Sequence, residues 1–469
     1  MQKTLFLFRD DLRLEDNPGY FAACEKGKVL PVYILDDLAP KVYAKGAASM
    51  LWLHHSLLDL KKSLENHLHI DKGDPEEILI SLIEKEKIDA VYMSASFAPW
   101  YRSFDGKIEK ILKKKGTEFS LFNSSYLRHP EEVVKDCGKP FSVFSPFKRK
   151  SYKFSVRKPF PKPKEPHWIK SKGSLQVDDL ALLPTRPWGK TVASHWEFGE
   201  KAAHKKLNVF LKRGLHGYKK GRDFPALEHT SRLSPHLAFG EISPFQIWHA
   251  VEKADAPEKD VEHFLSEITW REFSYYLLYH YPPLPEKNFQ KKFDRFPWQT
   301  HTKLLSAWEK GETGYPIIDA GMRQLWQTGY LHNRLRMTVG SFLVKNLLIH
   351  WHKGRDWFWD TLVDADIANN SAGWQWIAGS GADAAPYFRI FSPKSQVERF
   401  DPEGEYIRHF LPELKDLPQK YLAEPWQAPE DVLRKAGVCL GKNYPEPIID
   451  IQESRKKALA AFQSIGKTT

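Results

Sequence analysis

The N-terminal part of the chain, residues 1–128, alternates short apolar runs with stretches of helical periodicity, and this alternation constrains the fold most. Three runs have the length and composition of buried strands: TLFLF (4–8), VLPVYIL (29–35) and DAVYMSA (89–95). Helical spacing follows in residues 47–68, in residues 75–87 and after Pro99. Strands that alternate with helices form a parallel sheet covered on both faces, so we expect a doubly wound α/β domain.

The loop after the first apolar run, RDDLRLEDNPG (9–19), lacks the G-x-G-x-x-G pattern. That pattern lets a backbone approach the pyrophosphate of a dinucleotide closely. The domain therefore has the shape of a nucleotide-binding domain without the dinucleotide fingerprint. We expect any dinucleotide to bind elsewhere in the chain.

Periodicity breaks after this domain, and residues 129–194 are expected to form a linker. Residues 146–173 hold ten Lys or Arg and one acidic residue, together with several prolines, which is typical of a connector lying over a surface. Such a segment could also contact DNA. From His195 onward helical spacing dominates, so residues 195–469 are expected to form a second, mostly α-helical domain.

Composition limits the environment and the partners. The net charge is +11, which suits a polyanion such as nucleic acid but also serves solubility. Three scattered cysteines argue against a disulfide framework or a cysteine zinc site and indicate a reducing cytoplasm. The early charges after the start exclude a signal peptide, and no run of eighteen apolar residues predicts a membrane span.

The stretch TSRLSPHLAFG (230–240) combines hydroxyls with a helix start. Ser234 and Pro235 match the cap and first-turn preferences of a helix, and Thr230, Ser231 and Arg232 precede them. Free N–H groups, hydroxyls and a guanidinium together can bind a phosphate. A capped helix without a ligand is the alternative.

Two further stretches place polar residues on helical faces. In EITWREFSYYLLYH (267–280), Glu267, Trp270, Arg271 and Ser274 share one face, which could bind a base or bury an ion pair. In LHNRLRM (331–337), Arg334 and Arg336 lie on different faces and could meet two anions, one internal and one a partner's phosphate, or could simply be solvated.

The stretch DADIANNSAGWQW (364–376) holds two carboxylates, an amide and two indoles. Asp364 and Asp366 can pair an arginine or accept from ring N–H groups, and Asn370 can serve a ring nitrogen in either redox state. Trp374 and Trp376 point about 200° apart on a helix. A metal site would need His or Cys nearby, and none lies in this stretch, so no metal is expected.

These stretches, together with TGYPIIDAGMRQL (313–325) and GADAAPYFRIFSP (381–393), resemble the DNA photolyase/cryptochrome family in matching order. The resemblance runs from FRDDLRLEDNPG (8–19) nearly to the C-terminus. Within the family the chain is similar to class I-like photolyases that act on cyclobutane pyrimidine dimers. The resemblance implies an N-terminal α/β domain and a C-terminal helical domain that holds FAD.

By this resemblance, FAD-binding positions come from four stretches. Those positions are Tyr218, Thr230, Ser231, Arg232, Leu233, Ser234, Phe264, Glu267, Arg271, Ser274, Arg336, Asp364, Ala365, Asp366 and Asn370. Arg336 would pair with Asp364, and Asn370 would face flavin N5, where asparagine suits a reduced flavin. Trp374, Trp351 and Trp298 match a chain of indoles that photoreduces oxidised FAD.

The implied reaction is light-driven electron transfer from reduced FAD to a pyrimidine dimer flipped out of DNA. Matching catalytic positions in the lesion pocket are Glu267, Trp270, Asn333, Met337, Asn370 and Trp376. Matching DNA-binding positions are Arg222, Glu267, Trp270, Arg271, Asn333, Arg334, Trp376 and Arg389. We expect a monomer in the cytoplasm with dimer-containing DNA as its partner and no membrane association.

Two positions depart from the family pattern. Ser392 stands where many members have asparagine, which puts a DNA contact in doubt, and Tyr101 stands where some members have the acid that binds a folate antenna. A second chromophore is expected, either methenyltetrahydrofolate or a deazaflavin. The main alternative function is a cryptochrome-type blue-light receptor; an enzyme for (6-4) lesions and a purely structural DNA-binding protein fit the motifs less well.

Overall fold

The computed structural model describes residues 1–383, 387 and 389–466. Within them the chain forms two compact units, each of several segments. The first unit comprises Met1–His216, Ser231–Pro285 and Val363–Ala368. The second unit comprises Gly217–Thr230, Glu286–Leu362 and the chain from Asn369 on. The domain boundaries expected at residues 128 and 194 remain a prediction.

The first unit contains a parallel sheet, as the alternation of strands and helices predicts. Its strands are β1 (Gln2–Phe8), β2 (Gly27–Asp36), β3 (His69–Gly73), β4 (Ala90–Ser94), β5 (Glu118–Phe122) and β6 (His167–Trp168). The order is β3-β2-β1-β4-β5, with β6 paired to β2. The three strands expected from the apolar runs are β1, β2 and β4. The other strands are short and interrupted by polar residues, which hid them from a search for apolar runs.

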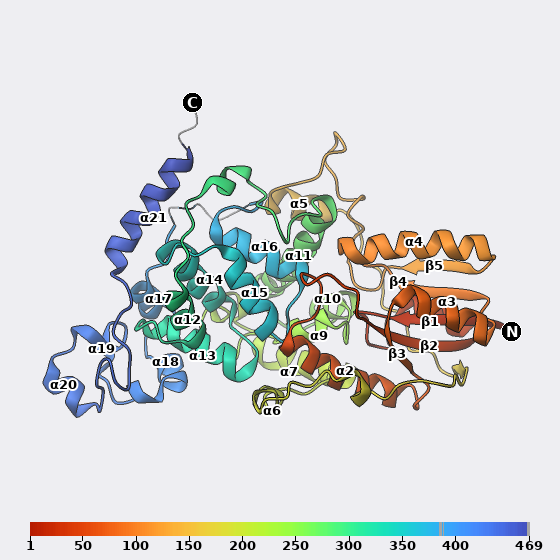
Figure 1. The fold of residues 1–469 in the computed structure, drawn as a ribbon, viewed down its shortest axis with the longest axis horizontal. Coiled ribbons are helices and arrows are strands. Elements are labelled where there is room, and N and C mark those ends of the chain that lie inside the picture. Colours follow the sequence, from red (N-terminus) through yellow and green to blue (C-terminus); the bar gives the residue numbers. More distant parts are fainter. Residues whose placement is uncertain (384–386, 388, 467–469) are drawn as a thin grey trace. The chain divides into compact units, whose positions relative to one another are not determined.

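Helices cover both faces of the sheet, and alternate residues of β1 supply the two cores. Phe6 and Phe8 pack with α1 (Pro18–Lys26) and α2 (Ala47–Ser63) on one face. Leu5 and Leu7 pack with α3 (Pro75–Glu86) and α4 (Pro99–Lys115) on the other. Figure 1 shows α4 and α2 on opposite sides of the sheet. This is the doubly wound arrangement that the sequence predicts.

Two helices differ from the expectation. The helix expected over residues 47–68 ends at Ser63, because Glu65 and Asn66 have positive φ angles of 50° and 65° that no right-handed helix can continue. Helix α1 was not foreseen, although Asn17 caps it by accepting from the Tyr20 N–H.

The segment expected as a linker is partly ordered into the unit. It contributes α5 (Phe144–Ser151), whose Phe144 and Phe147 are buried, and α6 (Trp188–Ala193). Its strand β6 pairs with β2 through the register Lys28 with His167. Part of the segment is therefore sheet and core rather than solvated connector.

The remaining helices carry the candidate site. The first unit adds α7 (Glu200–Val209), α9 (Ser234–Ala238), α10 (Pro244–Glu252) and α11 (Glu258–His280). The second unit holds α8 (Tyr218–Gly221), α12 (Thr302–Lys310), α13 (Pro316–Thr328), α14 (Asn333–Ser341), α15 (Trp351–Thr361), most of α16 (Ile367–Ala378), α17 (Pro393–Phe400), α18 (Glu405–Phe410), α19 (Gln419–Leu422), α20 (Glu430–Lys435) and α21 (Ile451–Gly466).

The helical pattern over residues 332–354 is interrupted. Helix α14 runs into a π-helical turn (Phe342–Asn346), and Leu348 then adopts a φ of 54°. Helix α15 begins afresh after His350, whose Nδ1 accepts from the His352 N–H at 3.1 Å. A capped restart of this kind places Trp351 at the first turn of a new helix.

The loop after β1 is held by the buried guanidinium of Arg13, which is 0% exposed. Arg13 donates to the carbonyl oxygens of Asp16 at 2.7 Å, Ser124 at 2.6 Å and Gly240 at 2.9 Å. These oxygens belong to the loop after β1, the loop after β5 and the turn after α9. Arg13 therefore joins the sheet to the helical segment that precedes α10.

We predict that Arg13→Met lowers the free energy of unfolding by about 3 kcal/mol or more, because three buried carbonyls lose their donor. Urea unfolding followed by circular dichroism measures the change. Arg149→Met, at an exposed position of α5, is the matched control and should change stability little. Equal stabilities of the two variants would contradict the anchoring role.

Candidate functional site

The segment before α9 contributes hydroxyls and a guanidinium, as the sequence predicts. Ser234 Oγ donates to Asp364 Oδ2 at 2.6 Å, which ties α9 to the chain just before α16. The expectation that Ser234 caps the helix is wrong: Leu233 occupies the cap position, and Ser234 is the first helical residue. Its hydroxyl faces a carboxylate from a distant segment instead of the free N–H groups of its own helix.

Helix α11 presents the expected residues along its length. Phe264 is 3% exposed, and its ring packs on Phe210 with centroids 4.7 Å apart. Glu267 is half-buried and lies 4.0 Å from His263 Nε2. Ser274 is buried, and its hydroxyl donates to the Trp270 carbonyl of the same helix at 3.2 Å.

Trp270 is held from one side by a residue that the sequence did not single out. The rings of Phe144 and Trp270 stack with centroids 3.6 Å apart and planes 9° apart. Trp270 remains half-buried, so the stack fixes the plane of the indole while part of the ring stays exposed. The distance between these residues in the sequence left no local signal for the pair.

Arg271 has internal partners. Its guanidinium donates to the Ser125 carbonyl at 2.9 Å and to Glu272 Oε1 at 3.0 Å. Burial raises the pKa of the Glu272 carboxyl to about 7, against the lowering effect of Arg271 and of the Leu127 N–H, which donates to it at 2.8 Å. The phosphate-facing role expected for Arg271 remains a prediction.

The second carboxylate of the DADIANN stretch meets a tyrosine. The Tyr275 hydroxyl donates to Asp366 Oδ2, and both groups belong to the first unit. Ala365, between the two carboxylates, is half-buried. Asp364 is 7% exposed, so this short segment presents one buried and one more accessible carboxylate.

In the second unit, α8 and α14 bring together several expected residues. Tyr218 is 6% exposed, and the Arg222 guanidinium lies 5.6 Å from its ring centroid. Arg334 pairs with Asp223 at 2.7 Å and lies over the Phe400 ring at 4.2 Å. Asp223 is therefore an internal acid for Arg334, one of the two arginines of the LHNRLRM stretch.

Other residues of the HNRLRM stretch differ in exposure. Arg336 Nε donates to the Leu331 carbonyl at 2.7 Å, and its guanidinium lies over Tyr330 at 5.5 Å. Asn333 is exposed and Met337 is half-buried. Burial lowers the pKa of His332, which caps α14, to about 4, so this histidine stays neutral.

Asn370 is oriented by the backbone of α15. Its Nδ2 donates to the Arg355 carbonyl oxygen at 3.1 Å. Only the nitrogen of the amide can make this bond, because an amide oxygen has no hydrogen to donate. The amide Oδ1 is therefore the group left to accept a hydrogen bond. An amide oxygen that can accept a hydrogen bond suits a ring N–H, which a reduced flavin carries at N5.

The two indoles of α16 lie on opposite faces, as helical spacing predicts. Trp374 is 2% exposed, whereas Trp376 is half-buried. Gln375 between them is 0% exposed; its Nε2 donates to the Lys287 carbonyl and its Oε1 accepts from the Phe289 N–H, both at 2.9 Å. These bonds fix the rotation of α16.

The three tryptophans expected to carry electrons lie along packed aromatic side chains. Trp374 packs directly on α15 at Gly354, where an added Cβ would come within 2.0 Å of its ring. Trp351, three residues earlier on α15, stacks on His350 with centroids 5.8 Å apart. His350 in turn lies 5.1 Å from the half-buried Trp298. Sequence spacing had not indicated Gly354 or His350.

The stretch GADAAPYFRIFSP is described only in part, since residues 384–386 and 388 lie outside the described residues. Arg389 is exposed, and its carbonyl accepts from Lys345 Nζ at 3.0 Å. Ser392 caps α17 by accepting from the Ser395 N–H. Lys345 is 1% exposed and was not foreseen, because a lysine within an apolar run usually reaches solvent.

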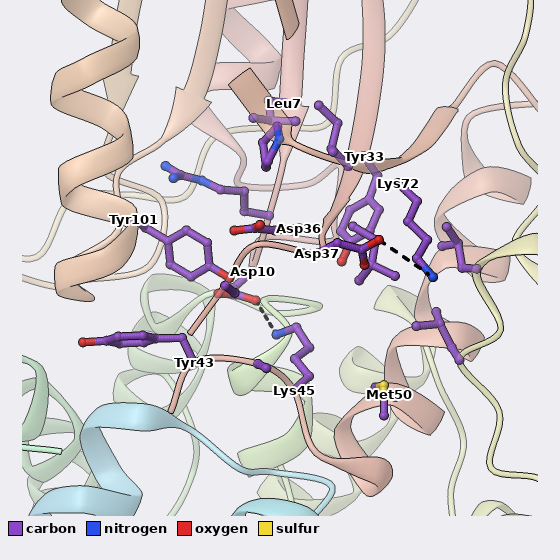
Figure 2. A pocket seen from close by; sticks show the side chains of 18 of the residues that line it. Leu7, Asp10, Tyr33, Asp36, Asp37, Tyr43, Lys45, Met50, Lys72 and Tyr101 are labelled. Carbon is purple, nitrogen blue, oxygen red and sulfur yellow. Dashed lines mark hydrogen bonds and ion pairs between the residues drawn. The ribbon is translucent and has the colours of Figure 1, made fainter. Parts of the chain in front are cut away.

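A cavity of about 310 Å³ opens at the carboxyl edge of the sheet. Its walls come from the ends of β1 and β2, from β3 and from α4 (Figure 2). Strand order reverses between β1 and β4, and ligands of open parallel sheets bind at this edge. The sequence predicted a sheet of this kind but not which of its residues would line a cavity.

Charged and phenolic side chains line the cavity (Figure 2). Lys45 Nζ pairs with Asp10 Oδ1 at 2.9 Å, and Asp36 accepts from Trp100 Nε1 at 2.8 Å. Tyr101 lines the wall, and burial raises its pKa to about 12, so it stays a neutral phenol. The position that departs from the folate-binding pattern therefore faces this cavity.

Comparison with known proteins identifies the family of the chain. Residues 4–164 match the family model described as DNA photolyase, and residues 264–464 match the FAD binding domain of DNA photolyase. A deoxyribodipyrimidine photo-lyase of Agrobacterium fabrum is 47% identical, with 98% of each chain covered. Cryptochrome-1 of Arabidopsis thaliana is 36% identical over 98% of this chain and 70% of its own length.

A solved structure described as a bacterial class III photolyase from Agrobacterium tumefaciens superposes with a TM-score of 0.97 and 46% identity. The match covers 100% of this chain and 98% of the chain in that structure. The class I-like subgroup expected from the sequence remains a prediction. The chain belongs to the DNA photolyase family, and the resemblance stated from its motifs is confirmed.

Relatives named deoxyribodipyrimidine photo-lyase support DNA repair by photolyase activity, and the match to the FAD binding domain supports FAD as the cofactor. The residues present fit such a group. The first unit offers hydroxyls and a guanidinium before α9 for phosphates, and the carboxylates of Asp364 and Asp366 for hydroxyl and ring N–H groups. The second unit offers the amide oxygen of Asn370 as an acceptor. Among the described residues, no helix is long and apolar enough to cross a membrane.

We predict that Gly354→Ala slows photoreduction of oxidised FAD by about tenfold or more, because the new methyl group displaces Trp374. Flavin absorbance under blue light with a thiol reductant measures the rate. Gly373→Ala is the matched control, since nothing lies within 4 Å of its added Cβ. An unchanged rate in the Gly354 variant would remove Trp374 from the electron path.

We predict that burial of Lys345 makes stability depend on pH. Burial lowers its pKa from 10.5 to about 7 in the folded protein. The unfolded chain then binds more protons between these two values, so the free energy of unfolding rises with pH across that window.

The measurement is urea unfolding at several pH values from about 7 to 10, a range set by the shift of Lys345. Lys345→Met should flatten the profile, whereas Lys353→Met, at an exposed position of α15, should leave it unchanged. Parallel profiles for the native protein and the Lys345 variant would show that the buried amine does not titrate in this range.

Proposed function

We propose that this protein repairs cyclobutane pyrimidine dimers in DNA, driven by light absorbed by bound FAD. The orientation of Asn370 carries the proposal, because its Nδ2 is committed to the Arg355 carbonyl and its Oδ1 suits the N–H of a reduced ring. A reduced flavin is the form that can donate an electron. The relative from Agrobacterium fabrum, named deoxyribodipyrimidine photo-lyase, supports the same substrate class.

Bound FAD supplies light absorption and the electron that starts dimer splitting. The chain's own residues bind and orient the lesion. Glu267 and Asn333 accept and donate hydrogen bonds at the base edges, while Trp270 and Trp376 offer indole faces for stacking. Met337, on α14 of the second unit, offers an apolar thioether for contact with the lesion. The Phe144 stack supports this role by holding the Trp270 ring in one plane.

Positive charge positions the DNA backbone. The net charge of +11 favours a polyanion, and Arg222, Arg271, Arg334 and Arg389 are the proposed phosphate-facing positions. Arg389 is exposed and suits a phosphate best. Arg334 already has Asp223 as a partner, so its contribution would be shared between that carboxylate and DNA.

Trp374, Trp351 and Trp298 are proposed to return electrons to oxidised FAD. The packing of Trp374 on Gly354, three residues after Trp351, and the contacts of His350 with both Trp351 and Trp298 support a continuous path. Trp298 is half-buried and could exchange electrons with a reductant in solution.

The cavity at the carboxyl edge of the sheet is proposed to hold the second chromophore. Its size and its position at the strand-order reversal suit a flat ring system. Tyr101 and Tyr33 offer phenolic rings for stacking, and the Lys45–Asp10 pair offers both charges. Either a folate or a deazaflavin meets this description. A monomeric state and a cytoplasmic location remain predictions.

A blue-light receptor without repair activity is the second candidate, favoured by the 36% identity to Cryptochrome-1 over almost the whole chain. The two candidates differ in lesion recognition. A repair enzyme binds a duplex with one thymine dimer more tightly than the undamaged duplex in the dark, whereas a receptor binds both alike. Equal affinities in fluorescence anisotropy would favour the receptor.

We predict that Glu267→Ala slows dimer splitting by about tenfold or more while leaving FAD bound, because a charge-assisted hydrogen bond to the lesion is lost. Single-turnover repair and flavin absorbance give the two readouts. Glu262→Ala, at an exposed position of the same helix, is the control. Loss of flavin from the Glu267 variant would mean that Glu267 supports the fold of the site instead.

A further inference from the structure

Tyr275 is the direct hydrogen-bond donor to one of the two carboxylates proposed to face the flavin. It lies on α11, and its hydroxyl donates to Asp366 Oδ2. Arg271 and Ser274 on this helix match FAD-binding positions of the family, whereas Tyr275 matches none of the motif positions named above. Its side chain nonetheless reaches the DADIANN segment.

The Tyr275 ring is held on two sides. The Arg271 guanidinium lies 4.9 Å from its centroid, and the Tyr126 ring meets it edge-on at 4.9 Å. Tyr126 is itself stacked on Phe97 at 3.8 Å, and its hydroxyl accepts from the Phe97 N–H at 3.2 Å. A ring clamped in this way delivers its hydroxyl to a fixed place.

The charges around Asp366 favour a persistent hydrogen bond. Burial, reinforced by the Asp366 charge, raises the pKa of Tyr275 well above 10, so the phenol keeps its proton and stays a donor. Two cations also act on Asp366: Arg271 on the same helix as Tyr275, and Lys45 from the wall of the sheet-edge cavity. These two cations partly balance the charge of the carboxylate.

We propose that Tyr275 is a positioning residue that sets the electron affinity of the bound flavin through Asp366. The proposal rests on the proposed function and on the resemblance to the family, which implies that Asp366 binds FAD on the side of its isoalloxazine ring. The hydroxyl draws charge from the carboxylate and fixes its orientation. Without this donor, more negative charge faces the ring, which disfavours addition of an electron.

The test measures the flavin midpoint potential of the holoprotein by spectroelectrochemistry. Tyr275→Phe should shift the potential to a more negative value and slow the approach to full reduction. Tyr276→Phe is the matched control. Tyr276 is the next residue of the helix and is 2% exposed, but its hydroxyl accepts from the Phe141 N–H at 2.8 Å and does not meet Asp366.

A double-mutant cycle separates this role from simple packing. Asp366→Asn should shift the potential in the positive direction, and adding Tyr275→Phe to it should then change little. An unchanged potential in the Tyr275 variant, or equal shifts with and without the carboxylate, would overturn the proposal. If the Tyr275→Phe variant loses FAD, the potentials of Asp366→Asn and of the double variant are compared instead. Equal potentials in these two proteins would support a role of Tyr275 that acts through Asp366.

The same variants distinguish this proposal from the proposed function. An unchanged potential in Asp366→Asn would mean that Asp366 does not face the flavin; it would overturn the role of Tyr275 and leave the repair proposal, which is carried by Asn370, in place. A shift in Asp366→Asn without a shift in Tyr275→Phe would remove only the role of Tyr275. Dimer repair by the Tyr276 variant should match that of the native protein.

Discussion

The fully buried guanidinium of Arg13 is the contact on which the arrangement of the first unit depends. Three carbonyl oxygens from three segments converge on it, and each would otherwise be a buried acceptor without a donor. The loop RDDLRLEDNPG thus replaces the phosphate-binding glycines of a dinucleotide fold with side chains that join a sheet to helices. Arg157 and Ser243 strengthen the junction through the buried Asp16. The absence of the glycine fingerprint is explained by this different task.

The two carboxylates proposed to face the flavin are held by segments that are distant from them in the sequence. Ser234 binds Asp364 and Tyr275 binds Asp366, so α9 and α11 each hold one carboxylate of the same short stretch. These contacts fix where the two charges lie before any ligand is present, which reduces the reorganisation needed when charge moves. In the second unit, the Arg355 carbonyl accepts from the Asn370 amide and fixes its orientation in the same way.

The sequence was informative where a pattern is local. Strands β1, β2 and β4, helices α2, α3 and α4, and the opposite faces of Trp374 and Trp376 all follow from periodicity and spacing. Prediction from the sequence failed where a distant group competes with a local one. The Ser234 hydroxyl donates to the Asp364 carboxylate instead of capping its own helix. The Phe144 stack on Trp270 and the burial of Lys345 were invisible for the same reason, since tertiary packing alone creates them. The family motifs named the candidate site residues, but not the side chains that hold those residues in place.

The most direct test of light-driven repair uses the holoprotein with its flavin reduced and an oligonucleotide that carries one cyclobutane thymine dimer. Loss of the dimer is followed under blue light and in the dark by chromatography of the DNA. The account predicts loss in the light alone, with the flavin still bound afterwards. An intact dimer after illumination, with a flavin spectrum that responds to light, would contradict repair and favour the receptor.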